Sequence, residues 1–183
     1  MSGVEWGVEA GQWSYGGWRD SFVMSWHAHI ECRATSLISM PHSKDLRRGR
    51  ISLPGTVYHI STVTLNREPV FLDLAAARCL IRTLREAEWR DDASTLAFVV
   101  MPDHLHWLMQ LGSGRDLSGV VGAVKNVTAH QLGRRLWQAG FHDHGVRAEE
   151  DLRVMARYIV ANPLRAGLVE RLGDYPYWDA RWL

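Results

Sequence analysis

Three stretches of the chain have the apolar and β-branched pattern of strands. Thr56–Leu65 reads TVYHISTVTL, and Ser94–Met101 reads STLAFVVM, which is apolar enough for a central strand. The dipeptide Pro102-Asp103 then predicts a tight turn into a third strand, His104–Leu111. The second and third strands are therefore expected to form a hairpin.

Three further segments carry apolar residues at helical spacing: Asp73 to Trp89, Asp116 or Ser118 to Leu136, and Asp151 to about Ala161. Each begins at an Asp or Ser, residue types whose side chains can accept a hydrogen bond from the first helical turn. Asn162-Pro163 breaks the third helix and starts another turn toward Leu168, because Pro is favoured as a first helical residue.

With a short candidate strand at Phe141–Arg147, the order of elements is βαββαβ followed by helices. This order predicts an α+β fold of the ferredoxin-like kind, in which helices pack on one face of a small antiparallel sheet and further helices follow at the C-terminus. No internal repeat interrupts this order.

Residues 1–39 differ from the rest of the chain. They are rich in Trp, Gly and Ser and show no sustained period of 2 or 3.6. They carry four acidic residues against two arginines; since the whole chain has a formal charge of +1, the remainder carries +3. We expect residues 1–39 to be a poorly ordered or non-native extension, and residues 40–183 to form the functional domain.

The overall composition is that of a soluble globular protein, with 46% hydrophobic and 22% charged residues. No apolar run approaches the length of a membrane span, and the start lacks a basic segment followed by an apolar core. Two cysteines cannot form a disulfide framework. These features predict a cytoplasmic protein without a membrane partner, and no obligate protein partner is evident.

His104-Leu105-His106 is the first candidate for chemistry. Alternate strand residues point to the same face, so both imidazoles project together and can share one divalent ion. A third ligand must then come from elsewhere. His142 and His144 form a rival pair with the same spacing, although the charged Asp143 between them is more typical of a surface edge strand.

Tyr158 and Asn162 form a second constellation, four residues apart and therefore on one helical face. A tyrosine hydroxyl can attack a phosphodiester if a metal polarises the phosphate, and an amide oxygen one turn later could ligate that metal. Alternatively, Tyr158 is an ordinary residue of an amphipathic helix and Asn162 is a cap before Pro163.

Several motifs occur together in one order: VVMPDHLHWLMQL, WQAGFHDHGVRAEEDL, ARYIVANPLRAGLVE and a closing Tyr175 to Asp179. In this combination the chain, from about Asp45 to its end, resembles the REP-associated tyrosine transposases, which are domesticated relatives of the single-tyrosine HUH transposases of insertion sequences. The resemblance leaves out residues 1–39.

This resemblance implies that Tyr158 is the catalytic nucleophile and that His104, His106 and Asn162 bind Mg²⁺ or Mn²⁺, with no organic cofactor. It also implies a substrate: single-stranded DNA hairpins of repetitive extragenic palindromes (REP), nicked and rejoined through a 5′-phosphotyrosine. Two other hypotheses stay open, a binder of structured single-stranded DNA that does not cut it and a metal hydrolase that uses activated water.

Basic side chains outside this set are candidates for phosphate contacts, because arginine suits bidentate binding of phosphate. They are Lys44, Arg47, Arg48 and Arg50 in a basic arm, Lys125, Arg134 and Arg135 on or near one helix, and Arg165 just past the helix that carries Tyr158. A solvated surface charge is the alternative explanation at each of these positions. Trp107 beside the metal motif could stack on a base, but it shares a strand face with Leu105, which favours core packing.

Overall fold

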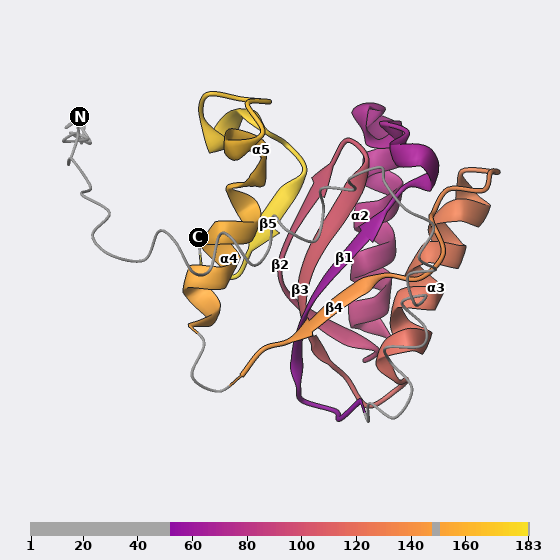
Figure 1. Ribbon diagram of the computed structural model, residues 1–183. Helices are drawn as coiled ribbons and strands as arrows, with labels where there is room; N and C mark the ends of the chain where they lie inside the picture. The colour runs from indigo at the N-terminus through magenta and orange to yellow at the C-terminus, as the bar shows by residue number, and fades with distance from the viewer. Residues whose placement is uncertain (1–51, 148–150, 183) are drawn as a thin grey trace, which may run out of the picture. The chain divides into compact units, whose positions relative to one another are not determined.

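The computed structural model describes residues 52–147 and 151–182. Within these ranges, one antiparallel sheet of five strands has the order β4-β1-β3-β2-β5 (Figure 1). The strands are β1 (Val57–Val63), β2 (Ala93–Met101), β3 (His104–Leu111), β4 (His142–Gly145) and β5 (Trp178–Ala180). The first four follow the expected βαββαβ order, which confirms the α+β, ferredoxin-like prediction. The short edge strand β5 was not predicted from the sequence.

The helices begin where the sequence predicts. They are α2 (Leu74–Trp89), α3 (Leu117–Gln131), α4 (Leu152–Val160) and α5 (Asn162–Arg165), with single turns of 3₁₀ helix at Leu65–Arg67, Val70–Leu72 and Leu172–Asp174. The carboxylates of Asp73, Asp116 and Asp151 each accept a hydrogen bond from a backbone N–H of the following turn.

One predicted helix boundary was wrong. The apolar pattern extended the second helix to Leu136, but α3 ends at Gln131. Gly133 has a φ of +64°, the left-handed conformation in which glycine commonly terminates a helix. Leu136 is buried beyond this turn, where its carbonyl accepts a hydrogen bond from the N–H of Leu65 (2.7 Å). Leu136 is a loop residue that packs in the core, and its spacing from the apolar residues of α3 is the same as that of one more helical turn.

Helices cover both faces of the sheet, but unequally (Figure 1). One buried cluster joins α2 and α3 to the side chains of one face, including Ile60, Phe98 and Trp107. A second cluster joins α4 to the opposite face through β2 residues such as Val99. Since α4 contacts β2, β3 and β5, it covers only part of that second face.

The β2–β3 hairpin is fixed at its turn by neighbouring backbone. The carbonyl of Asp103 accepts hydrogen bonds from both the N–H (2.8 Å) and the hydroxyl (2.9 Å) of Thr64, and the carbonyl of Pro102 accepts one from the N–H of Phe71 (2.9 Å). These bonds hold the residue that follows the turn, His104, at a defined position at the start of β3.

The predicted extension, residues 1–39, lies outside the described residues, so the proposed domain boundary near residue 40 stays a prediction. Among the described helices, none combines the length and the apolar character needed to cross a bilayer.

Candidate functional site

The two imidazoles of β3 lie on the face that α4 partly covers. In the antiparallel ladder, Ser61 of β1 and Val99 of β2 pair directly with His106, and directly paired residues present their side chains on the same face. Leu105 and Trp107 point the other way and are each 1% exposed. Trp107 is therefore a core residue, as its strand position indicated, and its indole N–H donates to the hydroxyl of Thr95 (3.1 Å).

A carboxylate orients His104. Its Nδ1 lies 2.5 Å from Oδ1 of Asp103, and the other oxygen of Asp103 accepts a hydrogen bond from Arg67 (3.0 Å). The hydrogen bond with His104 is the main cause that lowers the pKa of Asp103, so this carboxyl is ionised at neutral pH. A carboxylate on one ring nitrogen is a common way to fix the orientation of a metal-binding histidine. It leaves Nε2 of His104 with no hydrogen-bond partner among the described residues.

A third imidazole orients His106. Nδ1 of His106 lies 3.2 Å from Nε2 of His59 on β1, and the ring centroids are 5.3 Å apart. Burial lowers the pKa of His106 well below its usual range, with smaller contributions from the neighbouring histidines and Arg165. His106 is therefore neutral at physiological pH, the state in which an imidazole nitrogen can bind a metal. Sequence reasoning missed His59.

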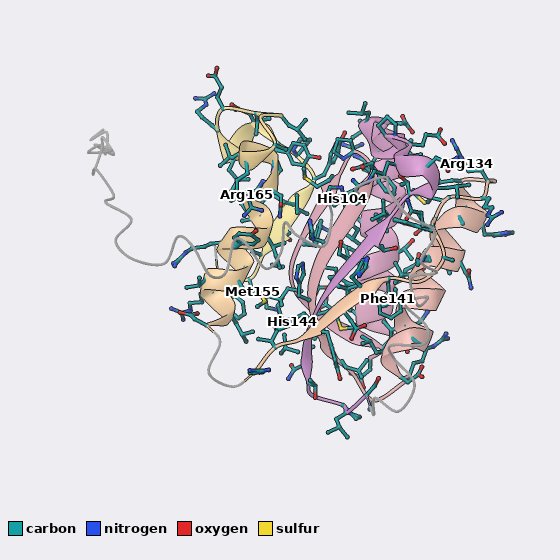
Figure 2. The ribbon with its side chains drawn as sticks, in the orientation of Figure 1. His104, Arg134, Phe141, His144, Met155 and Arg165 are labelled. Carbon is teal, nitrogen blue, oxygen red and sulfur yellow. The ribbon has the colours of Figure 1, made fainter. Side chains whose placement is uncertain are left out.

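The rival pair is on the same face as the first. β4 is an edge strand, as predicted, and pairs with β1 so that His142 faces Ser61 and His144 faces His59. In Figure 2, His144 lies farther along the sheet than His104, consistent with the pairing register. The structure thus places five histidines on one sheet face rather than separating the two pairs.

Pro163 determines how Asn162 is oriented. Proline has no N–H, so it cannot bond to the carbonyl of Ile159 four residues earlier. The side-chain amide of Asn162 donates to that carbonyl instead (2.7 Å), which directs its Oδ1 away from the helix backbone. The N-cap of α5 is Ala161, so the alternative reading of Asn162 as a capping residue was wrong.

Arg165 connects the helical candidates to one another. Its guanidinium carbon lies 3.7 Å from the centroid of the Tyr158 ring, and its Nη2 donates to Oδ1 of Asn162 (2.8 Å). Tyr158 is 36% exposed, and its hydroxyl has no hydrogen-bond partner among the described residues. The same guanidinium is close enough to His106 to contribute to lowering the pKa of that imidazole. Figure 2 shows Arg165 and His104 at the same end of the sheet.

These donors are of types that bind divalent cations. Both histidines have Nδ1 engaged and Nε2 without a hydrogen-bond partner in the described part of the chain. An amide oxygen has two lone pairs, so the bond from Arg165 leaves one on Asn162. No group of three or more His, Cys, Asp or Glu side chains within residues 52–147 and 151–182 could hold a metal ion. Any third protein ligand among the described residues would therefore be of another type, such as an amide.

The candidate DNA-contact residues have different surroundings. Lys125 donates to the backbone carbonyls of Gln138 (2.8 Å) and Gly140, so its ammonium supports a loop. Arg134 pairs with Glu68. Arg135 follows α3 on the opposite side of the sheet from α4, whereas Arg165 lies at the candidate site. The basic arm, Lys44, Arg47, Arg48 and Arg50, falls outside the described residues.

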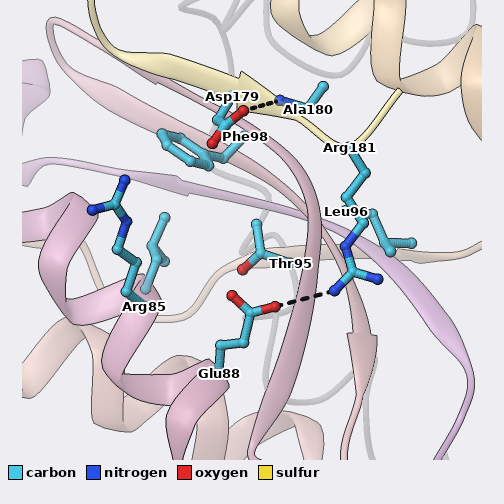
Figure 3. A pocket seen from close by; sticks show the side chains of 9 residues that line it. Arg85, Glu88, Thr95, Leu96, Phe98, Asp179, Ala180 and Arg181 are labelled. Atoms are coloured by element: carbon cyan, nitrogen blue, oxygen red, sulfur yellow. Dashed lines mark hydrogen bonds and ion pairs between the residues drawn. The ribbon is translucent and has the colours of Figure 1, made fainter. Parts of the chain in front are cut away.

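A small pocket lies away from this site, between α2 and the β2–β5 edge (Figure 3). Its volume is about 200 Å³, below the range of roughly 300–1,000 Å³ typical of small-molecule sites. Arg181 and Glu88 at its rim already form an ion pair (3.1 Å), and none of the predicted catalytic or metal-binding residues lines it.

Known transposases resemble this chain in sequence and in fold. A REP-associated tyrosine transposase of Escherichia coli (strain K12) is 34% identical over 83 residues, which are 44% of this chain and 50% of that protein. The chain spans about half the length of the curated relatives it matches.

A solved structure of a REP-associated tyrosine transposase bound to a REP hairpin aligns with a TM-score of 0.62 at 26% identity, covering 70% of this chain and 79% of that one. The family described as "Transposase IS200 like" matches residues 52–162. This match extends from the start of the described residues to Asn162 and covers more than half of the chain, which therefore belongs to the IS200-like transposase family.

Proposed function

We propose that this protein nicks and rejoins single-stranded DNA at REP-type hairpins, with Tyr158 as nucleophile. The observation that carries the proposal is the position of Arg165. It contacts the ring of Tyr158 and the amide of Asn162, and its charge acts on His106. These contacts support a single site shared by the helical and the strand candidates. The likeness to a transposase that was solved with a REP hairpin supports the choice of substrate.

His104, His106 and Asn162 would hold a divalent cation, Mg²⁺ or Mn²⁺. When bound, the cation supplies Lewis-acid polarisation of the scissile phosphate. The residues of this chain prepare that position: Asp103 and His59 orient the two imidazoles, and the bond from Asn162 to the Ile159 carbonyl orients the amide.

Tyr158 would attack phosphorus through its phenolic oxygen. The phenolic proton leaves to solvent and the bond from phosphorus to the 3′ oxygen breaks. The departing 3′ oxygen takes a proton from solvent, so that a 5′-phosphotyrosine and a free 3′-hydroxyl result. A 3′-hydroxyl can later reverse the step and join a different strand, because the phosphotyrosine retains an activated ester. Arg165 places a permanent positive charge beside the phenol, where the phosphate would arrive.

A covalent-adduct assay tests this proposal. The protein is incubated with a labelled hairpin oligonucleotide and Mg²⁺ or Mn²⁺, and a protein–DNA band that resists denaturation is expected. Tyr158→Phe should abolish the band and preserve hairpin binding. Tyr177→Phe is the control, since Tyr177 is partly buried and its ring meets that of Tyr175 edge to face, and it should behave as the unaltered protein.

Two outcomes would overturn the proposal. Cleavage that persists in Tyr158→Phe would make water the nucleophile, as in a metal hydrolase. Hairpin binding with no cleavage in either metal would make the protein a binder of structured single-stranded DNA.

A further inference from the structure

The sheet face with the two candidate ligands also carries a buried imidazole, His59, that is not itself a proposed ligand. His59 is 4% exposed and stands on β1 opposite Leu108, with Ser61 opposite His106. His59 and His106 are therefore diagonal neighbours on one face, which is within reach of large side chains. Their closest nitrogens, Nε2 of His59 and Nδ1 of His106, are 3.2 Å apart.

A hydrogen bond between two imidazoles requires one proton on one of the two facing nitrogens. His59 is 4% exposed, and burial of this kind disfavours the charged form of an imidazole. A neutral imidazole has one donor and one acceptor nitrogen. The location of the shared proton therefore sets the tautomer of both rings.

Only one of the two arrangements is compatible with a metal ligand at Nε2 of His106. If His59 donates, His106 carries its proton on Nε2, which then has no lone pair to offer. If His106 donates from Nδ1, its Nε2 lone pair is available. His104 has the corresponding partner in Asp103, whose carboxylate can only accept.

We infer that His59 is a positioning residue that accepts the Nδ1–H of His106 and so holds His106 in the tautomer that presents Nε2 as a ligand. This inference rests on the proposed function. The two ligands would then be oriented by different partners, a carboxylate at the more exposed end of β3 and a neutral ring at the more enclosed position. A neutral acceptor adds no net charge to a site that is already removed from water.

The tautomer can be measured in the metal-free protein with ¹⁵N-labelled histidine and long-range ¹H–¹⁵N spectra at pH 7.5. The expected result is a protonated Nδ1 and an unprotonated Nε2 on His106, with His59 unprotonated at Nε2. The His106 signals are assigned by their loss in His106→Gln. A protonated Nε2 on His106 would overturn the inference.

Two substitutions of His59 test its role in cation binding. His59→Gln retains a hydrogen-bond acceptor near the position of Nε2, and Mn²⁺ affinity should stay within about 3-fold of the unaltered protein. His59→Phe keeps a ring but removes the acceptor, and affinity should fall about 10- to 100-fold, as is typical when the partner of a metal-binding histidine is lost. Equal Mn²⁺ affinity in both variants would contradict the positioning role.

The exposed His142 on β4 provides a matched control, because it lies on the same face, and His142→Gln should leave Mn²⁺ affinity unchanged. Thermal unfolding of each variant separates loss of folding from loss of binding, and the tautomer measurement decides the question even if His59→Phe does not fold. If Zn²⁺ or Mn²⁺ changes the ¹H–¹⁵N signals mainly at Nε2 of His59, then His59 is itself a ligand and the inference is overturned.

Failure of the proposed function would be seen in a different measurement. In that case no covalent adduct forms at Tyr158, whichever tautomer His106 has.

Discussion

The two faces of β3 perform different tasks with alternating residues of one strand. Toward α2 and α3 it presents Leu105, Trp107 and Met109, each at most 1% exposed. Toward the α4 side it presents His104 and His106, each with a specific hydrogen-bond partner on Nδ1. The apolar face depends on volume and burial, whereas the histidine face depends on the identity and orientation of individual atoms.

Substitutions on the two faces should therefore affect different properties, stability in one case and cation binding in the other. Loss of volume on the apolar face is expected to lower the free energy of unfolding and to leave the metal-binding atoms in place in the folded fraction. Loss of a donor or its partner on the histidine face is expected to reduce cation binding with little effect on unfolding, because alternate residues of a strand contact separate layers.

The largest effect is expected from Trp107→Ala. Removing this fully buried indole should lower the free energy of unfolding by about 3–5 kcal/mol, through lost burial and the cavity it leaves. Chemical denaturation measures the change. Trp89→Ala is the control, since Trp89 is 81% exposed, and it should change the unfolding free energy by less than about 0.5 kcal/mol. A loss of Mn²⁺ affinity in folded Trp107→Ala would mean that the faces are not independent.

His106→Ala should instead weaken Mn²⁺ binding strongly and leave thermal stability almost unchanged. Mn²⁺ affinity should fall by more than about 100-fold, beyond the loss expected for an orienting partner, because a ligand itself is removed. Adduct formation on a hairpin should fall with it, and the thermal midpoint should change little. Titration calorimetry with Mn²⁺ checks the affinity. His142→Ala, on the same face, should bind Mn²⁺ normally; if it instead loses binding, the rival pair is the metal site.

Asp103→Ala is expected to weaken Mn²⁺ binding about 10- to 100-fold by releasing His104 from its orienting carboxylate. Asp103→Asn retains an acceptor oxygen but no charge, so its Mn²⁺ affinity should lie between that of Asp103→Ala and that of the unaltered protein. Arg67→Ala removes only the support of the carboxylate and should have a smaller effect. If all three bind Mn²⁺ equally well, Asp103 does not orient a ligand.

The smallest expected effect concerns Tyr175, which anchors the chain before β5. Its hydroxyl donates to the Val100 carbonyl (2.7 Å), and burial, with a contribution from Tyr177, raises the pKa of Tyr175 to about 12. Between pH 10 and 12 the unfolded phenol ionises before the folded one, so stability present below pH 10 is lost as pH rises. Tyr175→Phe should therefore make the fall of unfolding free energy between pH 10 and 12 less steep. Tyr177→Phe removes only the smaller contribution to this pKa and should reduce the steepness less.

Local features of the fold were predictable from the sequence because neighbouring residues determine them. The turn at Pro102-Asp103 and the strand His104–Leu111 occur as predicted, and each Asp placed before a helical pattern is a cap. Leu136 was assigned to a helix because periodicity alone does not detect the left-handed turn at Gly133. The strand β5 has three residues and is too short to carry a pattern.

The partners within the site were not predictable, because they depend on pairing between distant segments. Strand register brings His59, 47 residues away in sequence, to His106. The contact of Arg165 with Tyr158 and Asn162 depends on the turn at Ala161 and the missing N–H of Pro163. A sequence signal for His59 did exist: it shares a strand face with Ser61 while Tyr58 and Ile60 form the apolar side.

Anomalous diffraction from crystals soaked in Mn²⁺ would locate the cation and its ligands together, and so would test whether His104, His106 and Asn162 form one metal site. We expect one strong peak in coordination contact with Nε2 of His104, Nε2 of His106 and Oδ1 of Asn162. A peak bound by His142 and His144, or one that the Asn162 amide does not reach, would contradict this expectation.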